Sequence, residues 1–220
     1  IIGGEMGGRK LLPPEGEQTR PVTDRVKQSL FDIINPLLPD AEIYDCFAGT
    51  GSMGLEALSR GASFCTFFEA DRSTLARLTQ NIAALRVQER TRIVPGDIFK
   101  WFDRATTRPN MAGRIGADIV FLDPPYRFVR DRPDELIPLV FHLAHMHLKP
   151  GATLVFRHDA NDKLELPKLN KTDEREYGGM VLEFYRAELS VVTGPSPVPE
   201  QERARHGMTA SRIPVAPSDK

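Results

Sequence analysis

Asp45-Cys46-Phe47-Ala48-Gly49-Thr50-Gly51-Ser52-Met53-Gly54 is the stretch that decides the fold of this 220-residue chain. The residues from Ile43 to Phe47 form a short apolar run, which predicts a buried strand. Behind the glycines, Leu55, Leu58 and a closing Gly61 predict a helix. Glycine lets the backbone turn sharply and approach a ligand closely, and the first turn of a helix offers unpaired N–H groups. The stretch therefore predicts a strand, a tight turn and a helix that can hold a nucleotide-like cofactor.

The glycine pattern by itself does not identify the cofactor. Gly49, Gly51 and Gly54 have a spacing that dinucleotide dehydrogenases also use. Asp45 precedes the glycines, where a carboxylate suits a cationic amino group and gives a pyrophosphate no favourable contact. Glu69 ends a second predicted strand, where an acidic side chain can accept hydrogen bonds from ribose hydroxyls. The two acids favour S-adenosylmethionine as the cofactor; the alternative is a structural glycine turn with solvated acids.

A second motif, Asp123-Pro124-Pro125-Tyr126, follows an apolar run from Ala117 to Leu122 that predicts a core strand. Ligands of open parallel sheets bind beyond the carboxyl ends of the strands. Because proline has no N–H donor, Asp123 and the Pro124 carbonyl can only accept hydrogen bonds, which suits an exocyclic amine. Tyr126 offers a flat face on which a base can stack. Together with the cofactor turn, the motif predicts methyl transfer to a base nitrogen; the alternative is an ordinary Pro-Pro turn.

Strands and helices alternate along the chain, which predicts an α/β fold with a mostly parallel sheet. Gly178-Gly179 separates the last two predicted strands and indicates an antiparallel hairpin at the end of the sheet. This is the pattern of a Rossmann-like class I methyltransferase that depends on S-adenosylmethionine. The predicted strands are 42–47, 64–69, 91–95, 117–122, 151–157 and the pair around the hairpin, the second of which is 180–189. Five helices are predicted. The first begins at about residue 24, the second ends at residue 60 and the third follows residue 73. The fourth is short and opens after residue 97, and the fifth runs from about residue 134 to residue 147.

Three separated segments, together with Asp123-Pro124-Pro125-Tyr126, resemble the RsmD-type 16S ribosomal RNA guanine-N2 methyltransferases. The segments are Ile1-Ile2-Gly3-Gly4 with Gly8-Arg9-Lys10-Leu11, the run from Arg20 to Phe31, and the run from Asp45 to Ala62. The likeness extends to about Leu189, whereas the stretch 105–116 is longer than usual and the tail is unlike the family. The resemblance implies methylation of the exocyclic N2 of a guanine in small-subunit ribosomal RNA, guanine 966 in the family's usual substrate.

The expected site residues fall into three groups. Those expected to hold the cofactor are Asp45, Phe47, Ala48, Gly49, Gly51, Glu69, Asp97 and Ile98. Those expected to act in the transfer are Asp123, Pro124 and Tyr126. Those expected to contact the substrate are Arg20, Thr23, Pro125, Arg127 and Arg130, the first two by resemblance alone.

Several of these residues also have ordinary structural interpretations. Asp97 either accepts a hydrogen bond from the adenine amine or caps a helix, and Thr23 can cap a helix as well. Phe99 and Trp101 can flank adenine, but core packing is the favoured interpretation. Phosphate contact is favoured over plain solvation for three arginines that follow the second motif, Arg127, Arg130 and Arg132.

Composition limits the partners and the compartment. The formal net charge of −1 gives no global basic field, so RNA contacts must come from local clusters. Cys46 and Cys65 indicate buried thiols in a reducing compartment, and no apolar run reaches membrane length. His142, His145 and His147 lack the spacing of a metal site. We expect a cytoplasmic monomer without metal or membrane contact, whose partner is small-subunit ribosomal RNA or the assembling small subunit.

Residues 1–40 are expected to form an arm and a helix packed on a methyltransferase domain of residues 41–189, with a disordered tail over 190–220. Three rival functions share parts of the pattern. A DNA adenine-N6 methyltransferase would use the same second motif, because its target is also an exocyclic amine. A nicotinamide dehydrogenase would share the glycine turn but leave the second motif without a role. A non-catalytic factor that binds S-adenosylmethionine during ribosome assembly would bind the cofactor and move no methyl group.

Overall fold

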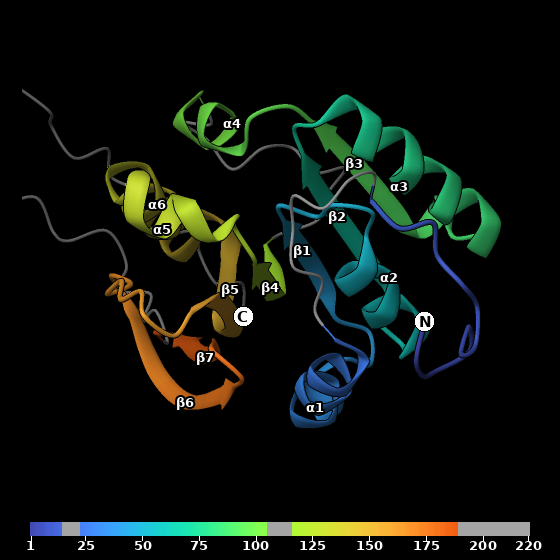
Figure 1. Cartoon of the computed structure of the whole chain (residues 1–220), viewed down its shortest axis with the longest axis horizontal. Helices are drawn as coiled ribbons and strands as arrows, with labels where there is room; N and C mark the ends of the chain where they lie inside the picture. Colours follow the sequence, from blue (N-terminus) through green and yellow to red (C-terminus); the bar gives the residue numbers. More distant parts are fainter. Residues whose placement is uncertain (15–22, 105–115, 189–220) are drawn as a thin grey trace, which may run out of the picture. The chain divides into compact units, whose positions relative to one another are not determined.

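A central sheet organises the computed structural model, which describes residues 1–14, 23–104 and 116–188 (Figure 1). Its seven strands lie in the order β3-β2-β1-β4-β5-β7-β6. Five are parallel: β1 (Glu42–Cys46), β2 (Phe64–Glu69), β3 (Thr91–Pro95), β4 (Ala117–Leu122) and β5 (Leu148–Asp159). The hairpin of β6 (Leu169–Tyr177) and β7 (Met180–Ala187) is antiparallel, with β7 paired to β5. The predicted α/β sheet with a terminal antiparallel hairpin is confirmed.

Helices cover both faces of the sheet, because β1 and β4 are apolar on both sides and must be buried twice. One core cluster joins the sheet to the helices α1 (Asp24–Ile34), α2 (Ser52–Ser59) and α3 (Arg72–Leu85). A second cluster joins its other face to α4 (Ile98–Arg104), α5 (Tyr126–Asp131) and α6 (Pro133–His142). Three short turns complete the described elements: η1 (Asn35–Leu37), η2 (Gln88–Arg90) and the π-helical η3 (Leu143–His147).

The region after the second motif differs from the prediction of one helix over 134–147. The chain forms α5 directly after the prolines, then breaks at Arg132, whose backbone is non-helical with φ −134° and ψ 40°. The break follows from Pro133, because a residue before proline avoids the helical conformation and proline fits the first turn of the next helix. The α-helical spacing then ends at His142 and gives way to η3. Strand β5 is also longer than predicted, since it begins at Leu148 and ends at Asp159.

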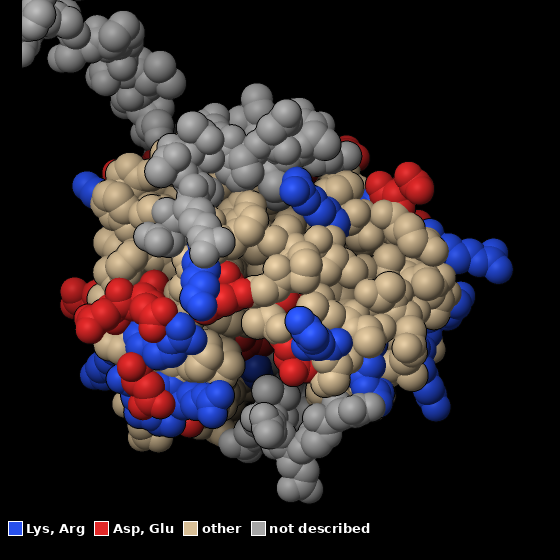
Figure 2. Space-filling model, turned by 90° about the horizontal axis from the view of Figure 1, so that it is seen from above, with Lys and Arg blue, Asp and Glu red and all other residues tan. Residues whose placement is uncertain are grey.

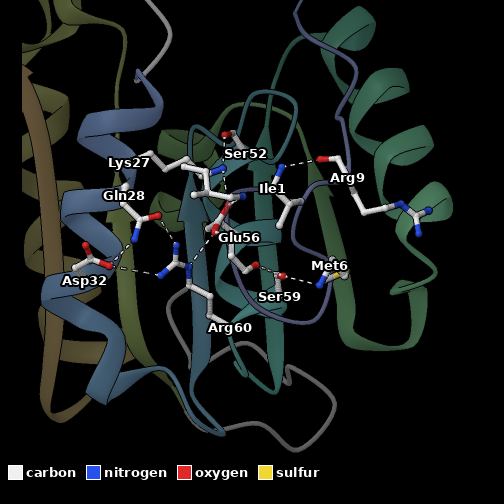
Figure 3. A network of polar contacts seen from close by, with 12 residues as sticks. Ile1, Met6, Arg9, Lys27, Gln28, Asp32, Ser52, Glu56, Ser59 and Arg60 are labelled. Atoms are coloured by element: carbon white, nitrogen blue, oxygen red, sulfur yellow. Dashed lines mark hydrogen bonds and ion pairs between the residues drawn. The ribbon is translucent and has the colours of Figure 1, made fainter.

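The N-terminal residues 1–14 contain turns but no helix or strand, and they lie along α2 and α3. The N–H of Glu5 donates to the Ser59 carbonyl at 2.7 Å, and the N–H of Leu12 donates to Asn81 at 2.8 Å. Figure 3 shows how this arm meets α1 and α2 around Glu56. Residues 1 to 189 belong to one compact unit.

The order of the strands creates a switch point between β1 and β4. From β1 the chain proceeds outward to β2 and β3, then returns to β4 on the other side of β1. Crevices for ligands in open α/β sheets form at such points, beyond the carboxyl ends of the strands. Both sequence motifs end up there, because one follows β1 and the other follows β4.

Candidate active site

The turn after β1 has the geometry that its glycines require. Gly49 and Gly51 have φ of +57° and +87°, in the left-handed region where side chains other than hydrogen are strained. Phe47 shares that region with φ +64°, which is uncommon for a bulky residue and concentrates strain at this turn. A Cβ on Gly49 would meet nothing within 4 Å, so open space lies over the turn. A Cβ on Gly54 would lie 2.4 Å from Phe67, so this glycine serves the close packing of α2 on β2.

Asp45 lies at the end of β1, almost fully buried beneath the turn. One of its oxygens accepts a hydrogen bond from the N–H of Gly54 at 2.9 Å. Burial raises the pKa of Asp45; the Gly54 N–H opposes this, while Asp123 and Glu69 raise it further. A cationic group placed over the turn would therefore stabilise the ionised form of Asp45.

Glu69 closes the turn from β2. Its Oε2 accepts from the N–H of Gly49 at 2.8 Å, and its Oε1 accepts from the N–H groups of Ala70 and Asp71. The Ala48 N–H donates to the carbonyl of Phe68, so the backbone of β2 also holds the turn. The structure thus brings Phe47, Ala48, Gly49, Gly51 and Glu69 together at this turn, and it gives Glu69 a structural role that the sequence did not indicate.

The residues after β3 lie at the same edge of the sheet. Asp97 accepts a hydrogen bond from the N–H of Phe99 at 3.0 Å, which makes it a cap of α4. Ile98 is buried, Phe99 is buried, and Trp101 packs partly buried against the same cluster. Core packing of Phe99 and Trp101 is confirmed. Asp97 therefore caps the helix, which is one of its two predicted roles. Its contact with adenine stays a prediction.

Asp123 follows β4, and its N–H lies 3.4 Å from the carbonyl of Cys46 at the end of β1. The second motif is therefore anchored to the strand that carries the cofactor turn. Pro124 is buried, and Pro125 is the residue from which α5 begins. Tyr126 is half-buried at the first position of α5.

Arg157 is a site residue that the sequence prediction missed. Its Nε donates to Asp123 Oδ1 at 2.6 Å, and its Cζ lies 5.4 Å from the centre of the Tyr126 ring. Strand pairing explains the contact, because Phe156 on β5 lies opposite Leu122, the residue before Asp123. A signal existed in the sequence, because Arg157 is the one charged residue of the predicted strand 151–157.

Three aromatic rings form one wall of this region. Phe47, Phe99 and Phe128 have ring centres 5.8 to 6.1 Å apart. Arg132 lies over two of them, 4.4 Å from Phe99 and 4.6 Å from Phe128, and is also bound to Glu135 at 2.6 Å. Arg132 is thus held in place by contacts within the protein.

The other predicted substrate residues differ in their surroundings. Arg127 is exposed on α5. Arg130 is exposed too, but its Nη1 lies 3.1 Å from Asp162, whose side chain is buried. Thr23 caps α1, with its hydroxyl accepting from the N–H of Val26 at 3.4 Å. Arg20 lies outside the described residues.

Figure 2 looks onto the end of the sheet at which the parallel strands finish. Basic and acidic side chains both occur on this face, so its visible, described surface is mixed in sign.

Within the described ranges, no three His, Cys, Asp or Glu side chains are grouped to hold a metal ion. His147 is buried against Phe102, with ring centres 4.7 Å apart. Both cysteines are free and buried, as predicted, and no described helix has the length and apolar character needed to cross a membrane.

The strand order, the antiparallel β7 beside β5, and the two motifs at the switch point define a Rossmann-like methyltransferase fold. The profile of the family described as "Conserved hypothetical protein 95" matches residues 1–186, and the chain belongs to this family. The resemblance to RsmD-type proteins is confirmed by the relatives. The chain is 42% identical over 127 residues to Ribosomal RNA small subunit methyltransferase D of Escherichia coli (strain K12), a match that covers 58% of this chain and 60% of that protein.

The protein of the same name from Haemophilus influenzae (strain ATCC 51907 / DSM 11121 / KW20 / Rd) is 33% identical over 169 residues, covering 76% of this chain and 82% of its own. Among solved structures, "Putative methyltransferase yhhF from Escherichia coli" superposes with a TM-score of 0.72 at 33% identity. That superposition covers 86% of this chain and 98% of the other.

Proposed function

We propose that this protein transfers a methyl group from S-adenosylmethionine to the exocyclic N2 of a guanine in small-subunit ribosomal RNA. The observation that carries the proposal is the junction of the two motifs, where the backbone of Asp123 meets Cys46 at 3.4 Å. This junction supports the proposal because it joins Asp123, the proposed acceptor of the amine, to the strand that leads into the glycine turn. The names of the relatives support ribosomal RNA as the substrate, and the Asp-Pro-Pro-Tyr sequence supports an exocyclic amine as the target.

The residues around the turn fit the proposed cofactor. Open space over Gly49 leaves room for a ligand, and the acids Asp45 and Glu69 face the turn from β1 and β2. S-adenosylmethionine carries a cationic sulfonium and a cationic amino group, and it supplies an already activated methyl group. Asp45 suits the cationic amino group, Glu69 can accept from the ribose hydroxyls, and Asp97 after β3 is the proposed partner of the adenine.

The protein's part in the reaction is mainly orientation. Asp123 and the carbonyl of Pro124 would accept the hydrogens of the target amine, so that the nitrogen lone pair faces the methyl group. Tyr126 would stack on the base. Holding two reactants in line accounts for a large share of such rate enhancements, by effective molarities of about 10⁵ M or more in favourable cases. The methylated amine becomes acidic and can lose its proton afterwards.

A target base must leave its stack to reach a pocket beyond the strand ends, at a cost of a few kcal/mol unless it already lies in a loop. We therefore propose a loop guanine, presented by free RNA or by the assembling small subunit in the cytoplasm. Arg127 is the exposed cation best placed for a phosphate, since it directly follows Tyr126. Arg130 would have to exchange its contact with Asp162 for one with RNA.

The test is transfer of tritium from labelled S-adenosylmethionine to three substrates in parallel: ribosomal RNA, small subunits and duplex DNA rich in adenine. Digestion of the product then identifies the modified nucleoside. We expect N2-methylguanosine in the RNA or the subunits, and no label with the Asp123→Ala variant. N6-methyladenine in DNA would replace the proposal with the adenine-specific rival. Cofactor binding without transfer to any substrate would favour a non-catalytic assembly factor.

A further inference from the structure

Arg157 connects the two residues that are proposed to hold the target base. Its Nε lies 2.6 Å from Oδ1 of Asp123, and its guanidinium lies over the ring of Tyr126. The Arg157 side chain is 12% exposed and that of Asp123 18%, so water screens the pair only weakly. A third contact, from Nη1 to the sulfur of Met180 at 3.5 Å, fixes the other end of the guanidinium on β7.

We propose that Arg157 is a positioning residue for the methyl transfer: it holds Oδ1 of Asp123 and thereby presents Oδ2 to the target amine. The hydrogen bond from Arg157 goes to Oδ1 and not to that second oxygen. A carboxylate has two oxygens, so one can be fixed by the protein while the other accepts from substrate. The inference rests on the proposed function, because the amine is the group that Asp123 is expected to hold.

The charges around Asp123 give Arg157 a second effect through the same contact. Asp45 faces this region from β1 and Glu69 from β2, whereas the positive charge of Lys27 on α1 acts to lower the pKa of Asp45. Burial raises the pKa of Asp123, and Arg157 acts against that rise. A protonated Asp123 would lose part of its accepting capacity, so removal of Arg157 should leave less of the active form at neutral pH.

The sign of the pH effect follows directly. Activity requires ionised Asp123, so the acidic limb of the kcat profile reports the pKa of that carboxyl in the complex. Loss of Arg157 raises this pKa and moves the limb to higher pH. The expected displacement is about 1 pH unit or more, the usual effect of an opposite charge at hydrogen-bond distance.

The experiment compares the wild-type protein with Arg157→Gln, Arg157→Lys and a matched control, Arg186→Gln. Arg186 lies on the neighbouring β7, is exposed, and donates to the backbone carbonyl of Gly151 at 2.7 Å. With Arg157→Gln we expect kcat on the acidic limb, at pH values below the wild-type midpoint, to fall about tenfold for each unit by which the limb moves, with affinity for S-adenosylmethionine within about twofold of wild type. Arg157→Lys should return the acidic limb toward its original pH, and Arg186→Gln should match wild type.

Carboxyl-carbon NMR titration of Asp123, assigned with the Asp123→Asn variant, measures the same change without turnover. Its midpoint should rise in Arg157→Gln and return in Arg157→Lys. An unchanged acidic limb and an unchanged midpoint in Arg157→Gln would overturn the inference, as would a faster enzyme. If the wild-type protein methylates no RNA guanine, the proposed function fails, and the inferred role in transfer fails with it even where the NMR midpoint moves. If Arg157→Gln does not fold, the test rests on Arg157→Lys. The inference then requires that the acidic limb of kcat and the NMR midpoint of Asp123 in this variant stay near their wild-type values.

Discussion

Gly54 illustrates how one residue links the cofactor turn to the core. Its missing Cβ would lie 2.4 Å from Phe67 and 2.5 Å from Cys65, both fully buried. We predict that Gly54→Ala lowers the free energy of unfolding by about 1–3 kcal/mol through overpacking. Gly49→Ala is the comparison, because its Cβ would meet no atom and its positive φ alone should cost about 1–2 kcal/mol. Urea denaturation measures the free energy of unfolding of both variants. A Gly54→Ala variant as stable as wild type would show that α2 can shift away from β2 at no cost in stability.

Glu69 is expected to act in binding rather than in transfer. Glu69→Ala removes an acceptor for the ribose and also releases the N–H of Gly49. We predict weaker binding of S-adenosylmethionine by about 1.5–3 kcal/mol, the scale of a hydrogen bond to a charged group. Calorimetry measures this, with Asp123→Ala as the control that should bind normally. Equal affinity of Glu69→Ala and wild type would remove Glu69 from the cofactor site.

At the scale of single residues, the sequence allowed us to predict which side chains lie together where the strand and turn pattern determines their positions. Asp45, Gly49 and Glu69 lie together because the strand and turn pattern determines where each strand ends. Arg157 was missed, since its partner Asp123 is 34 positions away and the contact depends on the register of β5 against β4. A pattern along one strand does not report which strand lies next to it.

At the scale of elements, a buried charge network joins the N-terminal arm, α1 and α2 (Figure 3). Glu56 of α2 is fully buried and accepts from the N–H groups of Ile2 and Gly3, each at 2.8 Å. It also pairs with Lys27 of α1 at 3.0 Å and with Arg60 at 2.8 Å. Because Lys27 also donates to Ser52, the first residue of α2, the network reaches the cofactor turn.

We predict that Glu56→Gln destabilises the fold by about 3–5 kcal/mol, because it leaves the buried Lys27 without its counter-charge. The double change with Lys27→Met should recover part of that loss. Glu135→Gln is the control, because its partner Arg132 pairs with it at the surface, where water and salt screen the pair and its contribution to stability is small. Denaturation of the wild type, Glu56→Gln, Lys27→Met and the double variant measures the coupling, and additive effects of the two changes would contradict it.

The same network should make stability depend on pH. Burial acts to raise the pKa of Glu56, but the Ile2 N–H and Lys27 outweigh it, and the pKa is lowered. A carboxyl whose pKa is lowered by folding stabilises the fold above its unfolded pKa, and this contribution is lost as the pH falls toward the folded value. Unfolding measured between pH 7 and pH 3 should therefore show a smaller loss in Glu56→Gln than in wild type. An identical loss in both proteins would exclude Glu56 as the group responsible.

Elements were predictable where local pattern determines them and not where distant contacts do. Strands β2, β3 and β4 match their predicted bounds, because each is a short segment between turns. Helix α5 was not predicted, since six residues carry too little periodicity, and the predicted 134–147 helix ends early at His142. Packing of the arm on the domain was expected, but its partners were not, because the bond from Ile2 to Glu56 spans 54 positions.

At the scale of the whole molecule, the sheet separates the proposed function from one of its rivals. Dinucleotide-binding sheets of the dehydrogenase type continue with a sixth parallel strand beyond the fifth. Here the antiparallel β7 takes that place next to β5. The glycine turn alone left the two classes open, whereas the Gly178-Gly179 hairpin, already visible in the sequence, distinguishes them.

The net charge of −1 leaves RNA binding to local cations, and two arginines on α5 should contribute unequally. Arg127 is exposed, whereas the charge of Arg130 is already compensated by Asp162 at 3.1 Å. We predict that Arg127→Gln lowers the slope of log affinity against log salt by about 1, the effect of one lost phosphate contact, and that Arg130→Gln changes it less. Filter binding to ribosomal RNA from low to moderate salt measures both slopes. Equal effects would mean that Arg130 leaves Asp162 when RNA binds, and a double change of Arg130→Gln with Asp162→Asn would then bind like Arg130→Gln alone.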